Sequence, residues 1–217
     1  MTSNIAPISP SATNPSTAPI TSSSSQRALI LGSTSSYRRD LLSRLRVPFT
    51  VAAPEVDETA MAGEAPIEMA NRLALAKARA VAQKFPQAVV IGSDQVADLD
   101  GVALGKPGNF ERATEQLRHM RGKTVIFHTA LAVVCLETGF EQHDIASVRV
   151  HFRDLSDADI SAYLRAESPY DCAGSAKSEG LGIALLASID NDDPTALVGL
   201  PLIRTCNMLR AAGLKLL

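Results

Sequence analysis

Two long strand-like segments, residues 123–137 and 141–153, are separated only by a short turn around Thr138 and Gly139. Strands joined this closely must pair as an antiparallel hairpin. Before the hairpin, strand-like and helix-like segments alternate, which favours parallel pairing through helical crossovers. The sequence therefore predicts an α/β architecture with a mixed sheet and a cleft beside it.

Hydrophobic periodicity and capping residues predict the other elements. We expect strands at 28–33, 49–53 and 88–93, helices at about 36–46, 66–84, 110–120 and 201–212, and a further helix over DADISAYLRA with Ser156 as its N-cap. No internal repeat is visible.

Composition narrows the class of protein. Of the 217 residues, 46% are hydrophobic and 20% are charged, as in ordinary globular domains. The net charge of -2 gives no basic surface for duplex DNA or RNA, although local lysines and arginines can still hold a small anion. No apolar run approaches the roughly 20 residues that span a bilayer. The scattered cysteines and histidines show no metal-ligand spacing, and cysteines without a CxxC motif fit a reducing, cytoplasmic compartment.

The N-terminal 26 residues contain no charged side chain and are mostly Ser, Thr, Pro, Ala and Asn. Such a composition buries too little apolar surface to offset the cost of ordering, so we expect a disordered tail at 1–26 and one domain at 27–217. The tail lacks the basic start and apolar core of a secretory signal. We expect it to have no catalytic role.

The stretch GSTSSYRRDLL places Arg38 and Arg39 where a helix should begin. Helix starts carry positive partial charge and normally favour acidic residues, so two arginines there suggest a bound anion. The stretch is not a GxxxxGK[ST] loop, which disfavours a P-loop nucleotidase.

The helix at 66–84 carries an apolar stripe that includes Leu73 and Val81, and Lys77 falls on the same stripe. A lysine in that position either extends to the edge of the buried face or meets a buried anion. Asp94 follows an apolar strand, where ligands collect in α/β sheets, but an aspartate there can also be an ordinary turn residue.

Two further loops carry charges of interest. PEVDE at 54–58 offers Glu55, Asp57 and Glu58 to a divalent cation, or forms a solvated acidic loop. LGKPG at 104–108 places Lys106 on a turn, where a surface lysine is the default interpretation. Together with the arginines, these residues form a set able to bind a triphosphate with a metal and to activate water.

Seven stretches then stand in a characteristic order: STSSYRRDLL, PEVDE, RLALAKA, GSDQV, LGKP, CAGSAKSEGLGI and DPTALVGLPLI. On these motifs the chain from about Ala28 onward resembles the Maf family of nucleoside triphosphate pyrophosphatases. The resemblance implies an elongated, inosine-triphosphatase-like mixed sheet flanked by helices, with two lobes around a central cleft. It also implies a divalent metal, Mg²⁺ or Mn²⁺, and cleavage between the α and β phosphates to give a monophosphate and pyrophosphate.

Two motifs separate branches of this family. The branch that acts on dTTP and UTP typically reads ADT and IQG, whereas this chain reads SDQ at 93–95 and SEG at 178–180. It is therefore similar to the branch that hydrolyses 7-methyl-GTP.

The resemblance also implies roles for single residues. Asp94 matches the proton acceptor, and Glu55 matches an acidic residue that helps with metal or water, so these two are the implied metal ligands. The positions around the phosphates are Ser33, Arg38, Arg39, Lys77 and Lys106.

Substrate choice is implied for Tyr37, Gln95 and Glu179. An N7-methylated guanine is cationic, so it gains from an aromatic face and from a carboxylate that accepts its N–H groups. Tyr37 stands where the family pattern often has tryptophan, and it should stack less strongly.

Two alternatives stay open. One is the same reaction on dTTP, UTP or another modified nucleotide, and the other is a non-catalytic, nucleotide-binding regulator of cell division. The complete set of charged motif residues argues against lost catalysis. The expected partner is a small-molecule nucleotide, without nucleic acid polymer or membrane, and the resemblance makes a homodimer plausible.

Overall fold

In a computed structural model of the protein, Met1 and residues 26–217 are described. The tail expected at 1–26 thus lies almost wholly outside the described residues. The helices and strands are β1 (Leu29–Gly32), α1 (Ser36–Ser43), β2 (Thr50–Ala52), α2 (Pro66–Lys84), β3 (Val89–Leu99), β4 (Val102–Leu104), α3 (Phe110–Met120), β5 (Thr124–Cys135), β6 (Phe140–Phe152), α4 (Asp157–Glu167), β7 (Leu186–Asp190) and α5 (Leu202–Ala211). Short 3₁₀ helices follow α4, at Ala173–Ser175, Leu181–Leu185 and Ala196–Val198.

The described strands form one seven-stranded mixed sheet in the order β2-β1-β3-β5-β6-β7, with β4 paired to β3. Strand β1 is parallel to both β2 and β3, whereas β5 and β6 form the predicted antiparallel hairpin. The α/β mixed sheet expected from the sequence is confirmed.

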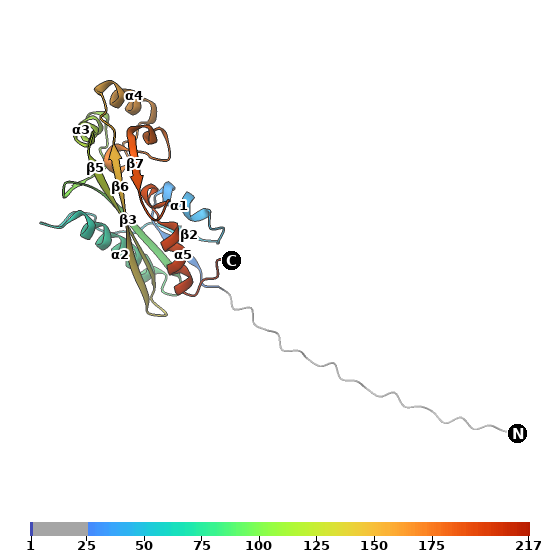
Figure 1. Ribbon diagram of the computed structural model, residues 1–217. Coiled ribbons are helices and arrows are strands. Elements are labelled where there is room, and N and C mark those ends of the chain that lie inside the picture. The colour runs from blue at the N-terminus through green and yellow to red at the C-terminus, as the bar shows by residue number, and fades with distance from the viewer. Residues whose placement is uncertain (2–25) are drawn as a thin grey trace.

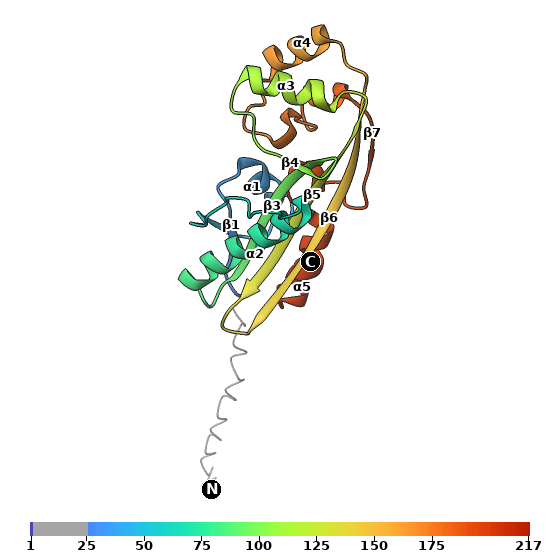
Figure 2. The same ribbon diagram turned by 90° about the vertical axis from the view of Figure 1, so that its left-hand side faces the viewer.

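Figure 1 shows an elongated molecule in which α2 and α5 cover opposite faces of one end of the sheet, while α3 and α4 lie at the other end. Figure 2 shows the β5–β6 hairpin running between the two ends. Buried side chains of α3 and α4 form one hydrophobic cluster with Phe127 and Phe152, and the α5 end has a separate cluster around Leu31 and Leu131. The hairpin therefore connects two lobes with their own cores.

The strand expected at 88–93 is longer than predicted, because β3 continues to Leu99. Its first part, through Gly92, pairs with β1, and its last part, from Ala97, pairs with β4 along the same edge. Residues 93–96 therefore have no strand on this edge, while β5 pairs with them on the other. Asp94 lies within β3 and not at its end, so the predicted position was wrong, although the end of β1 opens the sheet edge beside it.

Helix α2 packs directly on β3 at Gly92. A Cβ atom at this glycine would lie 2.3 Å from the carbonyl oxygen of Ala74 and 2.5 Å from the amide nitrogen of Ala78. Only a residue without a side chain allows so close an approach, which sets the distance between the face of α2 and the strand.

Two further features complete the fold. The Gln26 side chain donates a hydrogen bond of 3.2 Å to the carbonyl oxygen of Lys215, so the start and end of the described body lie together. Within the described part of the chain, no helix has the length and apolar character needed to cross a bilayer.

Candidate active site

A cavity of about 610 Å³ opens where β3 lacks a neighbour. Its walls come from six separate parts of the chain, within 33–38, 54–58, 69–77, 94–106, 171–179 and 197–199. The loop before α1 and helix α2 belong to one lobe, whereas Ala173 and Ala176 pack against the core of the other. The cavity thus lies between the lobes, as the expected central cleft.

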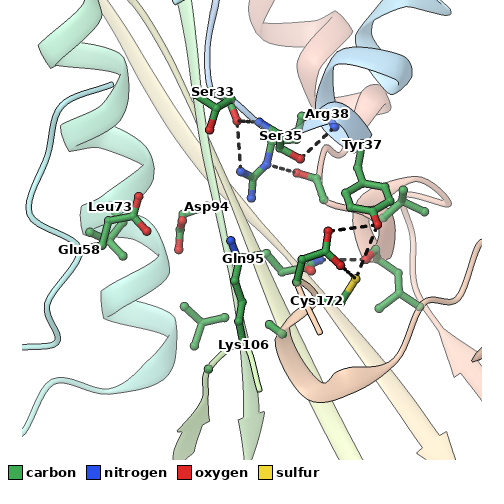
Figure 3. Close-up of a pocket in the computed structure, with 18 of the residues that line it drawn as sticks. Ser33, Ser35, Tyr37, Arg38, Glu58, Leu73, Asp94, Gln95, Lys106 and Cys172 are labelled. Atoms are coloured by element: carbon green, nitrogen blue, oxygen red, sulfur yellow. Dashed lines mark hydrogen bonds between the residues drawn. The ribbon is translucent and has the colours of Figure 1, made fainter. Parts of the chain in front are cut away.

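Arg38 enters the cavity from the first turn of α1. Ser35 caps this helix, since its hydroxyl accepts a hydrogen bond from the Arg38 amide at 3.4 Å. The Arg38 Nε donates to the carbonyl oxygen of Gly199 at 2.8 Å, and Nη1 donates to the Ser33 hydroxyl at 3.4 Å. These bonds fix the guanidinium, whose other N–H groups make no hydrogen bond to the described residues, and Figure 3 shows it between Ser33 and Asp94.

Lys77 forms salt bridges with two carboxylates at once. Its ammonium is 2.7 Å from Asp94 Oδ1 and 2.8 Å from Glu58 Oε1, and its side chain is only 7% exposed. The buried face predicted for this lysine is confirmed, and of the two alternatives it meets an anion. Burial lowers the pKa of Arg38, and the charges of Asp94 and Glu58 oppose that shift. Arginine nevertheless stays protonated at neutral pH.

Lys106 projects from the loop after β4 and lines the cavity. In Figure 3 its side chain runs toward Asp94 and Gln95. Within the described residues, neither Lys106 nor Arg38 forms a salt bridge, whereas Lys77 is paired twice. Two cations without acidic partners give this part of the cavity the charge needed to bind an anion.

Gln95 points to the face of β3 opposite Asp94, because neighbouring strand residues alternate. Its amide nitrogen lies 2.8 Å from the Thr129 hydroxyl and 3.1 and 3.0 Å from the carbonyl oxygens of Ala196 and Leu197. With the nitrogen held by these acceptors, the Gln95 side-chain oxygen is the group left for a ligand.

Tyr37 and the loop after α4 form another wall. The Tyr37 hydroxyl donates to Asp171 Oδ2 at 3.5 Å, and the Cys172 thiol lies 3.9 Å from that hydroxyl. Burial raises the pKa of Tyr37, and burial together with Asp171 raises the pKa of Cys172 to about 11, so both are neutral at pH 7. Glu179 lines the same wall, and within the described part of the chain neither it nor Asp171 forms a salt bridge.

The structure brings most of the sequence-predicted residues together. Those that line the cavity are Ser33, Tyr37, Arg38, Lys77, Asp94, Gln95, Lys106 and Glu179. Two others do not line it. Glu55 is exposed and pairs with Lys84 at 3.0 Å, and Arg39 is exposed and pairs with Asp40 at 3.5 Å.

Helical periodicity explains the exception of Arg39, whereas Glu55 lies in a loop. Arg39 follows Arg38 by one helical residue, about 100° around α1, so both cannot face the same cavity. In the loop before α2, the acidic residue that reaches the cavity is Glu58, three positions after Glu55. Sequence reasoning had no signal that separated these glutamates, and it missed Asp171 and Cys172, which no periodic element carries.

The donor set can also be compared with the needs of a metal ion. Within the described residues, no group of three or more His, Cys, Asp or Glu side chains is arranged to hold one. Lys77 binds Oδ1 of Asp94 and Oε1 of Glu58. The second oxygen of each carboxylate accepts no hydrogen bond from the described residues. Mg²⁺ often takes one or two carboxylates together with substrate phosphates. Asp94 and Glu58 therefore fit an ion that is completed by phosphate oxygens.

Comparison with known proteins shows the family of the chain. The chain is 74% identical over 192 residues to the 7-methyl-GTP pyrophosphatase of Albidiferax ferrireducens, a match that covers 88% of this chain and 96% of that protein. It is 69% identical over 209 residues to the protein of the same name from a Polaromonas species, with 95% of each chain covered. The family profile described as Maf-like protein matches residues 28–212. The chain belongs to the Maf family.

Proposed function

We propose that the protein is a nucleoside triphosphate pyrophosphatase that hydrolyses 7-methyl-GTP to 7-methyl-GMP and pyrophosphate. The observation that carries this proposal is the division of charge within one cavity. Among the described residues, Arg38 and Lys106 supply cations without acidic partners on the side of Asp94, where Lys77 balances part of the charge of Asp94 and Glu58, whereas Asp171 and Glu179 supply carboxylates beside Tyr37. A nucleotide that combines an anionic phosphate chain with a cationic base matches both parts, and the names of the similar proteins agree.

The carboxylate wall accounts for the choice of base. Methylation at N7 makes guanine cationic, so its ring gains from the electron-rich face of Tyr37. Glu179 accepts N–H groups from the edge of the base, and its charge strengthens those hydrogen bonds. Pyrimidine nucleotides carry no such charge and gain less from this wall.

The phosphate part carries the chemistry. Asp94 accepts a proton from the water that attacks the α-phosphorus, the bond from that phosphorus to the bridging oxygen breaks, and pyrophosphate leaves with the bond's electron pair. Arg38 and Lys106 stabilise the charge on the phosphate oxygens, and Ser33 adds a hydroxyl donor. Lys77 holds the Asp94 and Glu58 carboxylates in place.

The proposal includes a divalent ion, Mg²⁺ or Mn²⁺, held by Asp94 and Glu58. Such an ion neutralises phosphate charge and orients the triphosphate. Removal of divalent ions with EDTA is expected to abolish turnover, and excess Mg²⁺ is expected to restore it. Full activity in EDTA would remove the ion from the proposal.

The test is pyrophosphate release by the purified protein with Mg²⁺ or Mn²⁺, measured on 7-methyl-GTP, GTP, UTP, dTTP and CTP. We expect kcat/KM for 7-methyl-GTP to exceed that for GTP by about tenfold or more, since charge-assisted contacts to the base separate the two. A preference for UTP or dTTP would favour the pyrimidine alternative. Tight binding of all five without turnover would favour the regulator.

The resemblance also implies a homodimer and a cytoplasmic location, and both belong to the proposal. Light scattering on the purified protein measures the first, and cell fractionation measures the second. A monomer at micromolar concentration would contradict the dimer without affecting the proposed reaction.

A further inference from the structure

A salt bridge outside the cavity lies behind the wall that faces the base. Glu167, the last residue of α4, is 3.0 Å from the Lys177 ammonium and accepts a hydrogen bond of 2.9 Å from the Leu181 amide. Neither Glu167 nor Lys177 lines the cavity. The two side chains are 17% and 28% exposed, so water screens this pair only in part.

Glu167 holds both ends of the turn that carries Glu179. The turn is closed by a 3.0 Å hydrogen bond from the Gly180 amide to the Lys177 carbonyl oxygen, with Ser178 and Glu179 at its tip. A Cβ atom at Gly180 would lie 2.9 Å from the Glu167 carboxylate oxygens, so this glycine allows the close contact. The Lys177 amide also donates to the buried Tyr163 hydroxyl at 3.0 Å, which ties the turn to α4 a second time.

Lys177 is connected to the other base-facing residue as well. Its ammonium lies 5.8 Å from the centre of the Tyr37 ring, within range of a cation–π contact. A lysine here stands among groups that must attract a cationic base. Its charge opposes that task unless a nearby anion outside the cavity balances it.

Two carboxylates compete for this lysine. The charges of Glu167 and Glu179 both raise the pKa of Lys177, and Glu167 has the larger effect through its hydrogen bond. The Leu181 amide and Lys177 in turn lower the pKa of Glu167, so it is ionised at neutral pH. While Glu167 holds the lysine, Glu179 keeps its charge free for a ligand.

We infer that Glu167 is a positioning residue for base recognition, because it holds the Lys177 ammonium away from Glu179 and so leaves Glu179 free to bind a cationic base. The inference rests on the proposed 7-methyl-GTP activity. In the absence of the Glu167 charge, Lys177 pairs with Glu179 in its own turn, and the cationic base loses its anionic partner.

The test compares kcat/KM for 7-methyl-GTP and for GTP, which share a phosphate chain and differ in base charge. Glu167→Gln keeps an oxygen that can accept the Leu181 amide but removes the charge. We expect it to lower the ratio of the two values about tenfold, mainly through KM for 7-methyl-GTP, because the phosphate side is untouched. The double variant Glu167→Gln/Lys177→Gln is expected to restore the ratio to within about threefold of wild type, since the competing cation is gone.

Lys177→Gln alone is the matched control, and it should leave the ratio within about threefold of wild type, because Glu167 already balances this charge. A Glu167→Gln ratio equal to wild type would overturn the inference. A fall that the second substitution fails to restore would also overturn it, because the effect would then come from the shape of the turn. If wild type itself shows no preference for 7-methyl-GTP over GTP, the proposed function fails and this inference fails with it.

A folding defect in Glu167→Gln, detected by circular dichroism, would not end the test. Glu167→Asp keeps the charge but withdraws it by one methylene. The ratio is then expected to fall about fivefold, less than in Glu167→Gln but beyond the roughly threefold range of the control, and to recover with Lys177→Gln. An unchanged ratio in the folded Glu167→Asp variant would overturn the inference.

Discussion

Asp94 and Glu58 share one lysine, and that contact distinguishes them from acidic residues nearby. Lys77 reaches both from a buried position on α2, while Glu55 in the same loop turns outward to Lys84. The arginines of α1 divide in the same way, with Arg38 in the cavity and Arg39 at the surface. The direction of a side chain, and not its chemical type, thus decides whether it reaches the cavity.

Substitution of Asp94 tests the proposed proton acceptor. Asp94→Asn is expected to lower kcat by about 100-fold or more, because the amide cannot take the proton of the attacking water. Asp98→Asn is the matched control, since Asp98 lies four residues along the same strand, pairs with His128 and does not line the cavity. Pyrophosphate release and thermal unfolding should be measured on both. Equal activity of the two variants would remove Asp94 from its role.

The two glutamates of the loop before α2 provide a second comparison. Glu58→Gln is expected to lower kcat/KM about tenfold or more and to raise the Mg²⁺ concentration needed for half-maximal rate, because it removes a proposed ligand. Glu55→Gln should change both values by less than about twofold, as its carboxylate forms an exposed pair. A larger effect of Glu55→Gln than of Glu58→Gln would identify Glu55 as the metal ligand, as the family resemblance implies.

At the scale of elements, the loop before α2 is held in place by that helix. Arg72 on α2 binds the Glu64 carboxylate with both Nε and Nη2, the latter at 2.7 Å, and also donates to the Thr59 carbonyl oxygen at 3.2 Å. Thr59 directly follows Glu58 in the chain. The arginine therefore fixes the backbone next to a cavity residue.

This attachment predicts a pH dependence of stability. Arg72 lowers the pKa of Glu64 to about 2 in the folded protein, below the value of about 4.3 expected for an unfolded chain. The pair therefore stabilises the fold fully above about pH 5, and its contribution is lost as pH falls toward 2. We expect the difference in Tm between wild type and Glu64→Gln to be constant above pH 5 and to shrink below pH 4. A difference that persists unchanged at pH 2.5 would contradict this.

Local pattern predicted some elements far better than others. The helices at 66–84 and 110–120 have the predicted bounds because their apolar stripes, Pro66 at the start of one and Asn109 as the N-cap of the other are local signals. The end of β3 was missed because SDQ reads as polar turn chemistry, although β5 keeps pairing with it. Strands β4 and β7 were missed because each is short and depends on a partner distant in sequence. The positions of Asp171 and Glu179 likewise depend on how the two lobes meet.

At the scale of the whole molecule, the proposed substrate site is built by both lobes. Tyr37 comes from α1, yet its hydroxyl contacts Asp171 from the loop that packs on the other lobe. The proposed phosphate side of the cavity lies against α1 and α2, and the proposed base side lies against residues 171–179. A nucleotide bound as proposed spans the boundary between two hydrophobic cores, so it should stabilise the contact between them.

The N-terminal segment is predicted to stand apart from this arrangement. Removal of residues 1–26 should leave kcat/KM within about twofold of the full chain, since the segment has no charged side chain to contribute and Gln26 makes one exposed hydrogen bond. Parallel assays of the two proteins measure this. A truncated protein with a changed substrate preference would assign the segment a role at the cavity.

The hydrogen bond between Gln26 and Lys215 makes this part of the chain suitable for circular permutation. Because its beginning and end touch, a short peptide could join them, and new ends could be cut at the exposed Thr138–Gly139 hairpin turn without separating any two strands. The cavity residues would keep their neighbours in such a circular permutant. Their order along the chain would change, while the site itself, assembled from separate segments, would stay the same.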